Sequence, residues 1–290
     1  MPELPEVETV RRGLATRIIG KCIKTETHDT EKGFPNTAYD VANFLLGATV
    51  TAVRRRAKVL IIDVSTNYSL IIHLKMTGQL VYVDASDRFG AGHPNDSLIH
   101  TLPDTSTRVT LTFEDGARLH FNDQRKFGWM KLLPTAEVPE LPFMKKVGPE
   151  PLDASFTAED FKRRFIRRPR TTIKAALLDQ TVVAGIGNIY ADEALWGAKV
   201  HPSRLVASIS DEEFTRIYTA AREVMTLSIK KGGSSNRNYV NAEGKRGSYM
   251  DFARVFRREG LPCPRCTTVI EKIRVAGRGT HICPHCQVAP

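Results

Sequence analysis

The chain has 290 residues, of which 41% are hydrophobic and 26% charged, and this length suffices to bury the cores of two domains. No run of about 18 apolar residues could span a bilayer, and the acidic start lacks the basic and apolar regions of a signal peptide, so we expect a cytoplasmic protein without membrane association. The formal net charge of +10 would concentrate polyanions at the surface, and the abundant polyanion of a cytoplasm is nucleic acid, although charge alone names no particular partner.

The first ten residues place a potential nucleophile beside two carboxylates. Pro2 follows Met1, and removal of Met1 would expose the secondary amine of the proline ring. An α-amino group has a reference pKa of about 8, so part of the population is unprotonated at neutral pH and nucleophilic. Glu3 and Glu6 could then move protons. Alternatively, Met-Pro is an ordinary start and the glutamates only favour the N-terminus of a following helix.

The first half of the chain predicts one helix followed by short strands. Apolar Val7, Val10, Leu14 and Ile18 follow helical spacing, and Gly20 is placed to end this helix. The strands expected after it have turn signals but no helices between them, which favours a β-sandwich or flattened barrel. The stretch 84–107, rich in Asp, Ser, Pro and Gly, predicts a long mobile loop. The expected strands are 49–53, 59–64, 69–74, 80–83, 108–113 and 118–121, the last two joined by a hairpin turn at 114–116.

Residues 148–152, Gly-Pro-Glu-Pro-Leu, mark a domain boundary, because the pattern beyond them becomes helical. A polar, basic and glycine-containing loop is expected from residue 232 to 247. Helices are expected at 158–166, 172–178, 189–196 and 211–229.

Two Cys-x2-Cys pairs near the C-terminus predict a four-thiolate zinc ribbon, with Cys263, Cys266, Cys283 and Cys286 as ligands. In a reducing compartment, such clustering favours a metal over the alternatives of two disulfides or four free thiols. His281 and His285 are expected to be bystanders or phosphate contacts, since four thiolates already satisfy zinc. Between the pairs, a basic hairpin suits a phosphate or groove contact, or is a solvated face; its cations are Lys272, Arg274 and Arg278.

The segment 123–128, Asp-Gln-Arg-Lys-Phe-Gly, places bulky Phe127 near the cation of Arg125 on a turn after a strand. Proteins that extract a base from duplex DNA need a wedge for the vacated stack and a cation for the orphaned partner. Phe127 and Arg125 fit that need, although Phe127 could also be a core residue.

Two other motifs have a functional and a structural interpretation. Lys58 follows three arginines at the mouth of a strand, and is either part of a solvated strand edge or held near the active amine. Residues 185–188, Gly-Ile-Gly-Asn, open a helix whose N–H groups, with the Asn188 amide, could grip a phosphate. Plain N-capping by Asn188 is the alternative.

Taken together, these motifs resemble the bacterial formamidopyrimidine-DNA glycosylase family over almost the whole chain. The resemblance implies an α+β fold in which an N-terminal helix and β-sandwich precede a helix-two-turns-helix domain with a zinc ribbon, and DNA lies in the cleft between them. The matching segments are 2–14, 55–58, 73–78, 123–128, 148–152, 185–191, 201–204 and 277–281. The implied parts are a catalytic domain 1–134, a linker 135–152, a helix-two-turns-helix domain 153–232, a lesion-capping loop 233–250 and a finger 251–290.

The resemblance also implies a bifunctional DNA glycosylase and AP lyase of base-excision repair, which removes oxidised purines such as 8-oxoguanine and formamidopyrimidines. Pro2 would form a Schiff base with the sugar, and β,δ-elimination would cleave the strand. By similarity, Glu3 is the main general acid/base and Glu6 helps in ring opening or hydration. Lys58 would donate a proton and contact a phosphate, and Arg278 would engage the phosphate lost in the second elimination.

The implied partner is damaged double-stranded DNA, bound by a monomer in the bacterial cytoplasm and nucleoid, with one structural Zn²⁺ and no organic cofactor. The DNA backbone would be held by Asn188, His73, Lys174 and Arg170. The void left by the flipped nucleotide would be filled by Met76, Arg125 and Phe127. Residues 234–249 correspond to the loop that caps the extruded base.

Some positions depart from the family pattern. The 84–107 stretch is longer than usual, Ser106 stands where many members place a DNA-contacting histidine, and Phe256-Arg257 replaces Tyr-Gly in the commoner Val-Tyr-Gly-Arg. An endonuclease VIII-like glycosylase for oxidised pyrimidines is the nearest alternative, but Leu4, the 7–10 continuation and the full capping loop favour the purine-directed branch. A non-catalytic zinc-ribbon DNA-binding protein would account for the charge and the cysteines, but not for the amine and its carboxylates.

Overall fold

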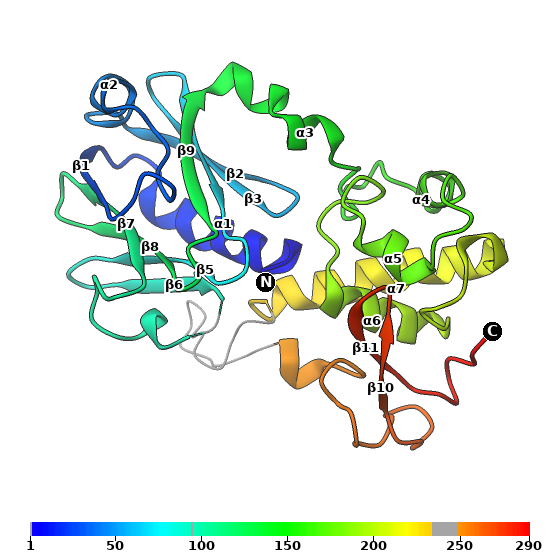
Figure 1. The fold of residues 1–290 in the computed structure, drawn as a ribbon. Coiled ribbons are helices and arrows are strands. Elements are labelled where there is room, and N and C mark those ends of the chain that lie inside the picture. The colour runs from blue at the N-terminus through cyan, green and yellow to red at the C-terminus, as the bar shows by residue number, and fades with distance from the viewer. Residues whose placement is uncertain (1, 94, 234–248) are drawn as a thin grey trace. The chain divides into compact units, whose positions relative to one another are not determined.

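The computed structural model describes residues 2–93, 95–233 and 249–290, and the chain divides into two compact units (Figure 1). One unit comprises Met1–Lys145 with Gly232–Ser248, and the other comprises Lys146–Lys231 with Tyr249–Pro290. The first unit is built of a helix and two antiparallel sheets, and the second of helices with a two-stranded hairpin. The α+β class expected from the sequence is therefore confirmed.

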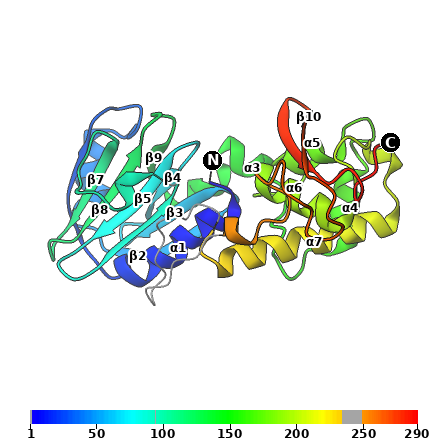
Figure 2. The same ribbon diagram turned by 90° about the horizontal axis from the view of Figure 1, so that it is seen from below.

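The first helix, α1 (Leu4–Ile18), forms as its apolar spacing predicts. Its stripe of Val7, Val10, Leu14 and Ile18 is completely buried. Glu3 and Glu6 form a capping box at its start, in which the Glu3 N–H donates to Glu6 Oε2 at 2.8 Å. The helix packs along β2 and β6, which are one edge strand of each sheet (Figure 1). It therefore closes one open side of the sandwich. Figure 2 shows α1 beside β2 from below.

The two sheets bury a common apolar core that includes Leu60, Ile72, Leu80 and Phe121. In strand order, the larger sheet contains β1 (Ile23–His28), β7 (Thr107–Phe113), β8 (Arg118–Asp123), β5 (Gly78–Val83) and β6 (Arg88–Gly92). The smaller sheet contains β2 (Val50–Arg56), β3 (Val59–Val64), β4 (Tyr68–His73) and β9 (Trp129–Pro134). The first unit also contains the short helical segments α2 (Ala38–Asp40), η1 (Val41–Leu45) and η2 (Asp96–Leu98).

The expectation of a mobile loop over 84–107 is wrong for much of that stretch. Arg88–Gly92 forms β6, which pairs antiparallel with β5 and supplies the sheet with its edge strand. Phe89 packs so closely on Gly13 of α1 that a Cβ at Gly13 would lie 2.0 Å from the ring. Arg17 of α1 also forms an ion pair with Asp87 at 2.6 Å. Contacts with α1 therefore stabilise this part of the 84–107 stretch, whose own composition favours a loop.

The second unit buries a helical core that includes Phe161, Phe165, Tyr190 and Leu195. All four helices expected here are confirmed: α4 (Ala158–Phe165), α5 (Ile173–Leu178), α6 (Asn188–Ala198) and α7 (Asp211–Lys230). The C-terminal hairpin consists of β10 (Glu271–Val275) and β11 (Arg278–Ile282), and short turns lie at η4 (Val206–Ser208) and η5 (Tyr249–Phe252). The stretch 135–152, expected as a linker, carries η3 (Thr135–Glu140) and α3 (Pro142–Lys146).

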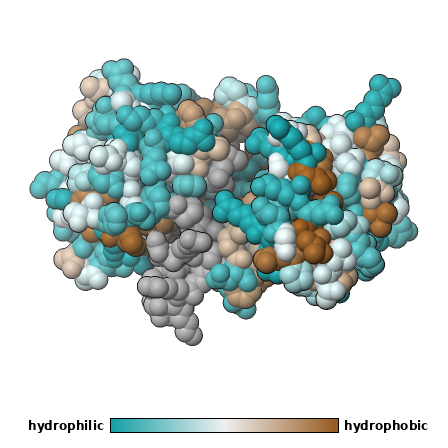
Figure 3. Space-filling view, turned by 60° about the horizontal axis from the view of Figure 1, so that its bottom comes forward, coloured by the Kyte–Doolittle hydropathy of each residue, from teal (hydrophilic) through white to brown (hydrophobic). Residues whose placement is uncertain are grey.

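The surface agrees with the polar composition. On the face shown in Figure 3, hydrophilic residues predominate and hydrophobic residues form smaller, separate areas. Among the described residues, no helix combines the length and the apolar character needed to cross a bilayer.

Candidate active site and zinc centre

Pro2, Glu3 and Glu6 lie together at the start of α1, and all are buried. Only 3% of Glu3 and 2% of Glu6 are exposed, so their carboxyl groups act in a largely desolvated environment in which proton transfers are sensitive to neighbouring groups. Met1 lies outside the described residues, so its expected removal stays a prediction. The capping box gives Glu6 a structural role, because its carboxylate fixes the backbone of Glu3.

Gly233 is part of this environment, and the sequence interpretation missed its role. It adopts φ +87°, and a Cβ at this position would lie 3.3 Å from Glu6 Oε1. Close approach and left-handed backbone together require glycine here. The pair of glycines directly after a long helical pattern was the available signal. The rest of the expected capping loop, 234–248, lies outside the described residues.

Lys58 lies on the tight turn between β2 and β3, and only 7% of it is exposed. The solvated-edge interpretation of Lys58 is therefore wrong. The adjacent Val59 pairs with His73 on β4, and burial, followed by the charges of Lys75 and Lys58, lowers the pKa of His73 to about 3. The Lys75 N–H donates to His73 Nδ1 at 3.1 Å, which leaves Nε2 as the protonated nitrogen of the neutral ring. His73 can thus offer a phosphate an N–H donor but not a positive charge.

Glu8 ties the helix of Pro2 to the turn of Lys58. Burial alone would raise the pKa of Glu8, but hydrogen bonds from Arg11 and Arg12, with the charge of Arg55, lower it to about 2. The Arg55 guanidinium donates to Glu8 at 3.2 Å and to the Ala57 carbonyl at 2.9 Å. This chain of contacts joins α1 to the residue that precedes Lys58. Sequence interpretation gave no role to Glu8, because its contact with Arg55 joins residues 47 positions apart in the chain.

The three expected void-filling residues all project from the surface. Met76 is 37% and Phe127 is 46% exposed, and the Arg125 guanidinium lies 4.9 Å from the centre of the Phe127 ring. The alternative that Phe127 belongs to the core is therefore wrong. The fully buried Asp123 carboxylate accepts the N–H groups of Arg125, Phe127 and Gly128 at 3.2, 2.9 and 2.7 Å, and also the Thr77 hydroxyl. One carboxylate thus fixes the turn that carries Arg125 and Phe127.

Asn188 is the first residue of α6 and follows the N-cap Gly187, so plain N-capping by its side chain is wrong. Its amide donates to the Gly279 carbonyl at 3.0 Å, which places it beside the finger hairpin. Arg278 opens β11 and is exposed, and so is Arg170, which precedes α5. Both are accessible to a phosphate from solvent.

Lys174 does not fit the expected contact with the DNA backbone. It is completely buried, and its ammonium donates to Asp192 Oδ1 at 2.6 Å, Thr280 Oγ1 at 2.7 Å and the Gly279 carbonyl at 3.2 Å. Asp192 in turn accepts the His281 N–H at 2.9 Å. A lysine with all its donors engaged in protein contacts has none left for phosphate. Lys174 therefore joins α5 and α6 to β11, and we correct its assignment to a structural one.

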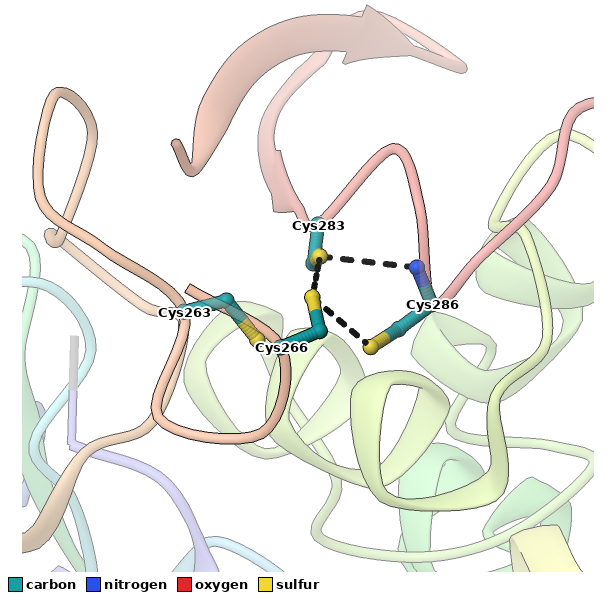
Figure 4. Close-up of side chains that lie close together, drawn as sticks. All are labelled: Cys263, Cys266, Cys283 and Cys286. Carbon is teal, nitrogen blue, oxygen red and sulfur yellow. Dashed lines mark hydrogen bonds between the residues drawn. The ribbon is translucent and has the colours of Figure 1, made fainter. Parts of the chain in front are cut away.

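The four predicted cysteine ligands converge at the base of the finger hairpin (Figure 4). Their sulfur atoms lie within 4.8 Å of one another, and Cys266 Sγ lies 3.4 Å from Cys283 Sγ and 3.5 Å from Cys286 Sγ. Four sulfurs around one zinc lie about 3.8 Å apart at the Zn–S distance of about 2.3 Å, so the cluster fits zinc. N–H groups of Trp196 and Arg265 point to Cys263 Sγ at 3.4 Å, as expected around thiolate charge.

Comparison with known proteins shows which family the chain belongs to. A formamidopyrimidine-DNA glycosylase from Desulforamulus reducens is 42% identical to this chain over 292 residues and is matched over 100% of both chains. The chain belongs to the formamidopyrimidine-DNA glycosylase family. The enzyme of that name from Pediococcus pentosaceus is also 42% identical, with 99% of each chain covered.

Family models and solved structures agree with this membership. Residues 1–130 match the formamidopyrimidine-DNA glycosylase N-terminal domain, 147–239 its H2TH domain, and 260–288 a zinc finger found in FPG and IleRS. The Lactococcus lactis enzyme bound to DNA with an abasic site is similar with a TM-score of 0.85 and 35% identity, over 99% of this chain and 100% of that one. The Thermus thermophilus enzyme is similar with a TM-score of 0.82 and 37% identity, over 99% of this chain and 98% of that one.

Family membership makes this chain a base-excision-repair DNA glycosylase with a zinc finger, as the motifs predicted. The alternative of a non-catalytic zinc-ribbon protein is therefore wrong. The four-cysteine cluster and the zinc-finger match together support one structural zinc.

Proposed function

We propose that this protein excises oxidised purines, namely 8-oxoguanine and formamidopyrimidines, from duplex DNA and then cleaves the strand at the resulting site. The observation that carries the proposal is the buried group of Pro2, Glu3 and Glu6 at the start of α1, in a chain that matches its family from end to end. A point mutant of the Lactococcus lactis relative, 35% identical to this chain, is known in complex with DNA containing Fapy-dG, a formamidopyrimidine lesion.

Pro2 is the nucleophile in this proposal. After loss of Met1, the nitrogen lone pair attacks the anomeric carbon, the bond from that carbon to the damaged base breaks, and the base leaves with its electron pair and a proton. The sugar ring opens to an iminium that is necessarily cationic, because a secondary amine has no second proton to lose. That charge acidifies the neighbouring sugar C–H, so the 3′ phosphate and then the 5′ phosphate leave by β- and δ-elimination.

Buried acids and bases serve these steps. Glu3 shuttles the protons, Glu6 assists ring opening or hydration, and Lys58 donates a proton and contacts a phosphate. Arg278 stabilises the phosphate that leaves in the second elimination. The zinc ion, held by the four cysteines, acts structurally by keeping the hairpin of Arg278 folded.

DNA binding uses residues of both units, some exposed and some half-buried. Asn188, His73 and Arg170 hold the backbone, and Met76, Arg125 and Phe127 fill the space that the flipped nucleotide leaves. We further propose that the enzyme acts as a monomer in the cytoplasm. Its net charge of +10 supports association with the nucleoid through DNA.

Borohydride trapping on abasic duplex DNA tests the nucleophile. We expect the wild-type protein, confirmed by mass to lack Met1, to be reduced covalently onto the DNA. Pro2→Gly should bind the duplex but trap and cleave at least tenfold less, because a primary amine forms a less persistently charged iminium. Pro139→Gly, at an exposed proline outside the site, should trap like the wild type. Wild-type trapping by Pro2→Gly would refute the assignment.

The substrate class needs a panel of duplexes, each with one defined lesion. Faster excision of 8-oxoguanine and formamidopyrimidines than of oxidised pyrimidines supports the purine-directed proposal. The Lactococcus lactis relative is also known in complex with DNA containing an oxidised pyrimidine, so that lesion belongs in the panel. Faster excision of the pyrimidine lesion would establish the endonuclease VIII-like alternative instead.

A further inference from the structure

Arg257 occupies a backbone conformation that disfavours it. Its φ is +57°, in the left-handed region where any side chain costs backbone energy and glycine does not. The preceding backbone is held firmly, because the buried Glu193 carboxylate accepts the N–H groups of Arg254, Val255 and Phe256 at 3.0, 2.9 and 2.8 Å. A strained arginine at a position that would suit glycine indicates that the side chain has a use.

Arg257 lines a surface hollow of about 450 Å³ within the second unit. The hollow lies where α6 begins and where the finger hairpin passes, and its walls include Asn188, Phe256, Lys272 and Gly279. Asn188 Oδ1 is buried there without a hydrogen-bond partner. A buried acceptor without a donor indicates that the hollow is not completed by protein groups.

The charges of this hollow leave Arg257 available for an anion. Its one acidic wall residue, Glu259, is engaged by Lys272 at 3.4 Å and faces His281 Nε2 at 3.1 Å. Within residues 2–93, 95–233 and 249–290, Arg257 makes no ion pair, and its contact with the Phe256 ring, at 5.8 Å, is long. Phe256 is only 9% exposed and meets His281 edge-on, so it cannot serve as a platform for a base.

We propose that Arg257 binds a phosphate of the DNA backbone in this hollow, in addition to the phosphate contacts of Asn188 and Arg278. The inference rests on the proposed function, since it takes DNA as the ligand. Guanidinium and phosphate match in charge and in geometry, because two N–H groups can donate to two phosphate oxygens. Phe256 carries no hydroxyl, so Arg257 is the donor that this turn can offer a phosphate.

The test compares Arg257→Gly with Lys199→Gly. Lys199 is an exposed cation of the same unit, at φ +59°, outside the hollow, so both variants lose one charge and both relieve a left-handed residue. The probes are a duplex with one tetrahydrofuran abasic analogue and the same duplex without it, and affinity is measured against KCl concentration.

We expect Arg257→Gly to weaken binding of both duplexes by about tenfold and to reduce the slope of log K against log[KCl] by about one. Lys199→Gly should match the wild type, Arg257→Lys should retain the slope with weaker binding, and the Tm of Arg257→Gly should be equal or higher. Equal affinities and slopes for the two glycine variants would overturn the proposal.

Trapping with borohydride on abasic DNA, run with the same proteins, separates this inference from the proposed function. Trapping depends on Pro2, whereas the salt slope depends on phosphate contacts. A salt slope reduced by about one in Arg257→Gly supports the phosphate contact even where trapping fails. An unchanged salt slope refutes the contact even where trapping succeeds.

Discussion

At the scale of single residues, three buried carboxylates position the groups that are expected to act on DNA. Glu8 links α1 to the turn of Lys58, Asp123 fixes the turn of Phe127, and Glu193 holds the backbone before Arg257. Each accepts several hydrogen bonds, so each offsets its desolvation and restricts one short segment. These residues are therefore positioning residues, and none of them needs to touch DNA.

His73 makes stability depend on pH. Its pKa is lowered from 6.5 to about 3 in the folded state, chiefly by burial, so the unfolded state binds the proton more tightly. The stabilising contribution of the neutral ring is fully present above pH 6.5 and is lost as the pH falls toward 3. Between pH 6.5 and 5, we expect wild-type stability to fall by about 2 kcal/mol more than that of His73→Gln.

Urea unfolding at pH 8, 6.5 and 5 measures this difference. His120, whose pKa burial lowers to about 4, is present in both proteins, so its contribution cancels in the comparison. Parallel pH profiles for the two proteins would show that His73 is not buried as a neutral ring.

At the scale of elements, long-range contacts decide the order of segments whose own sequences favour loops. Strand β6 forms within a Gly- and Asp-containing stretch because it pairs with the edge of β5 and because the Phe89 ring packs directly against Gly13 of α1. The hairpin of β10 and β11 is likewise anchored from outside, by the buried pair of Lys174 and Asp192.

Removal of Lys174 tests this anchor. Lys174→Ala leaves the Asp192 charge buried without its cation, so we expect a loss of about 3–5 kcal/mol in the free energy of unfolding. The double variant Lys174→Met with Asp192→Leu should recover much of that loss, because it removes both charges. Lys162→Ala, which removes the half-buried partner of the exposed Asp211, should be nearly neutral in the same urea titration. A small effect of Lys174→Ala would contradict the anchoring role.

At the scale of the whole molecule, the zinc ribbon depends on its metal because its own apolar core is small. That core consists of Trp196, Val255 and Ile270 around the buried cysteines 263 and 283. A cluster of this size cannot offset the entropy of ordering the finger without the metal. Folding of the finger, and with it the presentation of Arg278, is thereby linked to zinc.

Cys266→Ser tests this dependence. We expect loss of bound zinc, at least a tenfold loss of DNA affinity, and a change in the fluorescence of Trp196, whose indole N–H lies 3.4 Å from Cys263 Sγ. Cys22→Ser makes the same chemical change at a cysteine outside the cluster and should keep both zinc and affinity. Zinc content by atomic absorption, with affinity for the abasic-analogue duplex, measures both variants; wild-type affinity in zinc-free Cys266→Ser would contradict a structural need for the metal.

The sequence by itself determined the features that depend on local spacing. Apolar periodicity predicted α1 and the four helices of the second unit, and paired cysteines predicted the metal cluster, because these patterns are set by residues close in the chain. The motifs also carried the family assignment that the relatives confirm.

Only the tertiary structure decided the environment of each side chain. It buried Lys174 against Asp192, exposed Phe127, brought Gly233 against Glu6 and turned part of the 84–107 stretch into a strand. Each outcome depends on a partner distant in sequence, and burial, rather than residue type, decides whether a charge meets solvent or another protein group. A lysine that suits phosphate binding by its chemistry became a structural residue for that reason.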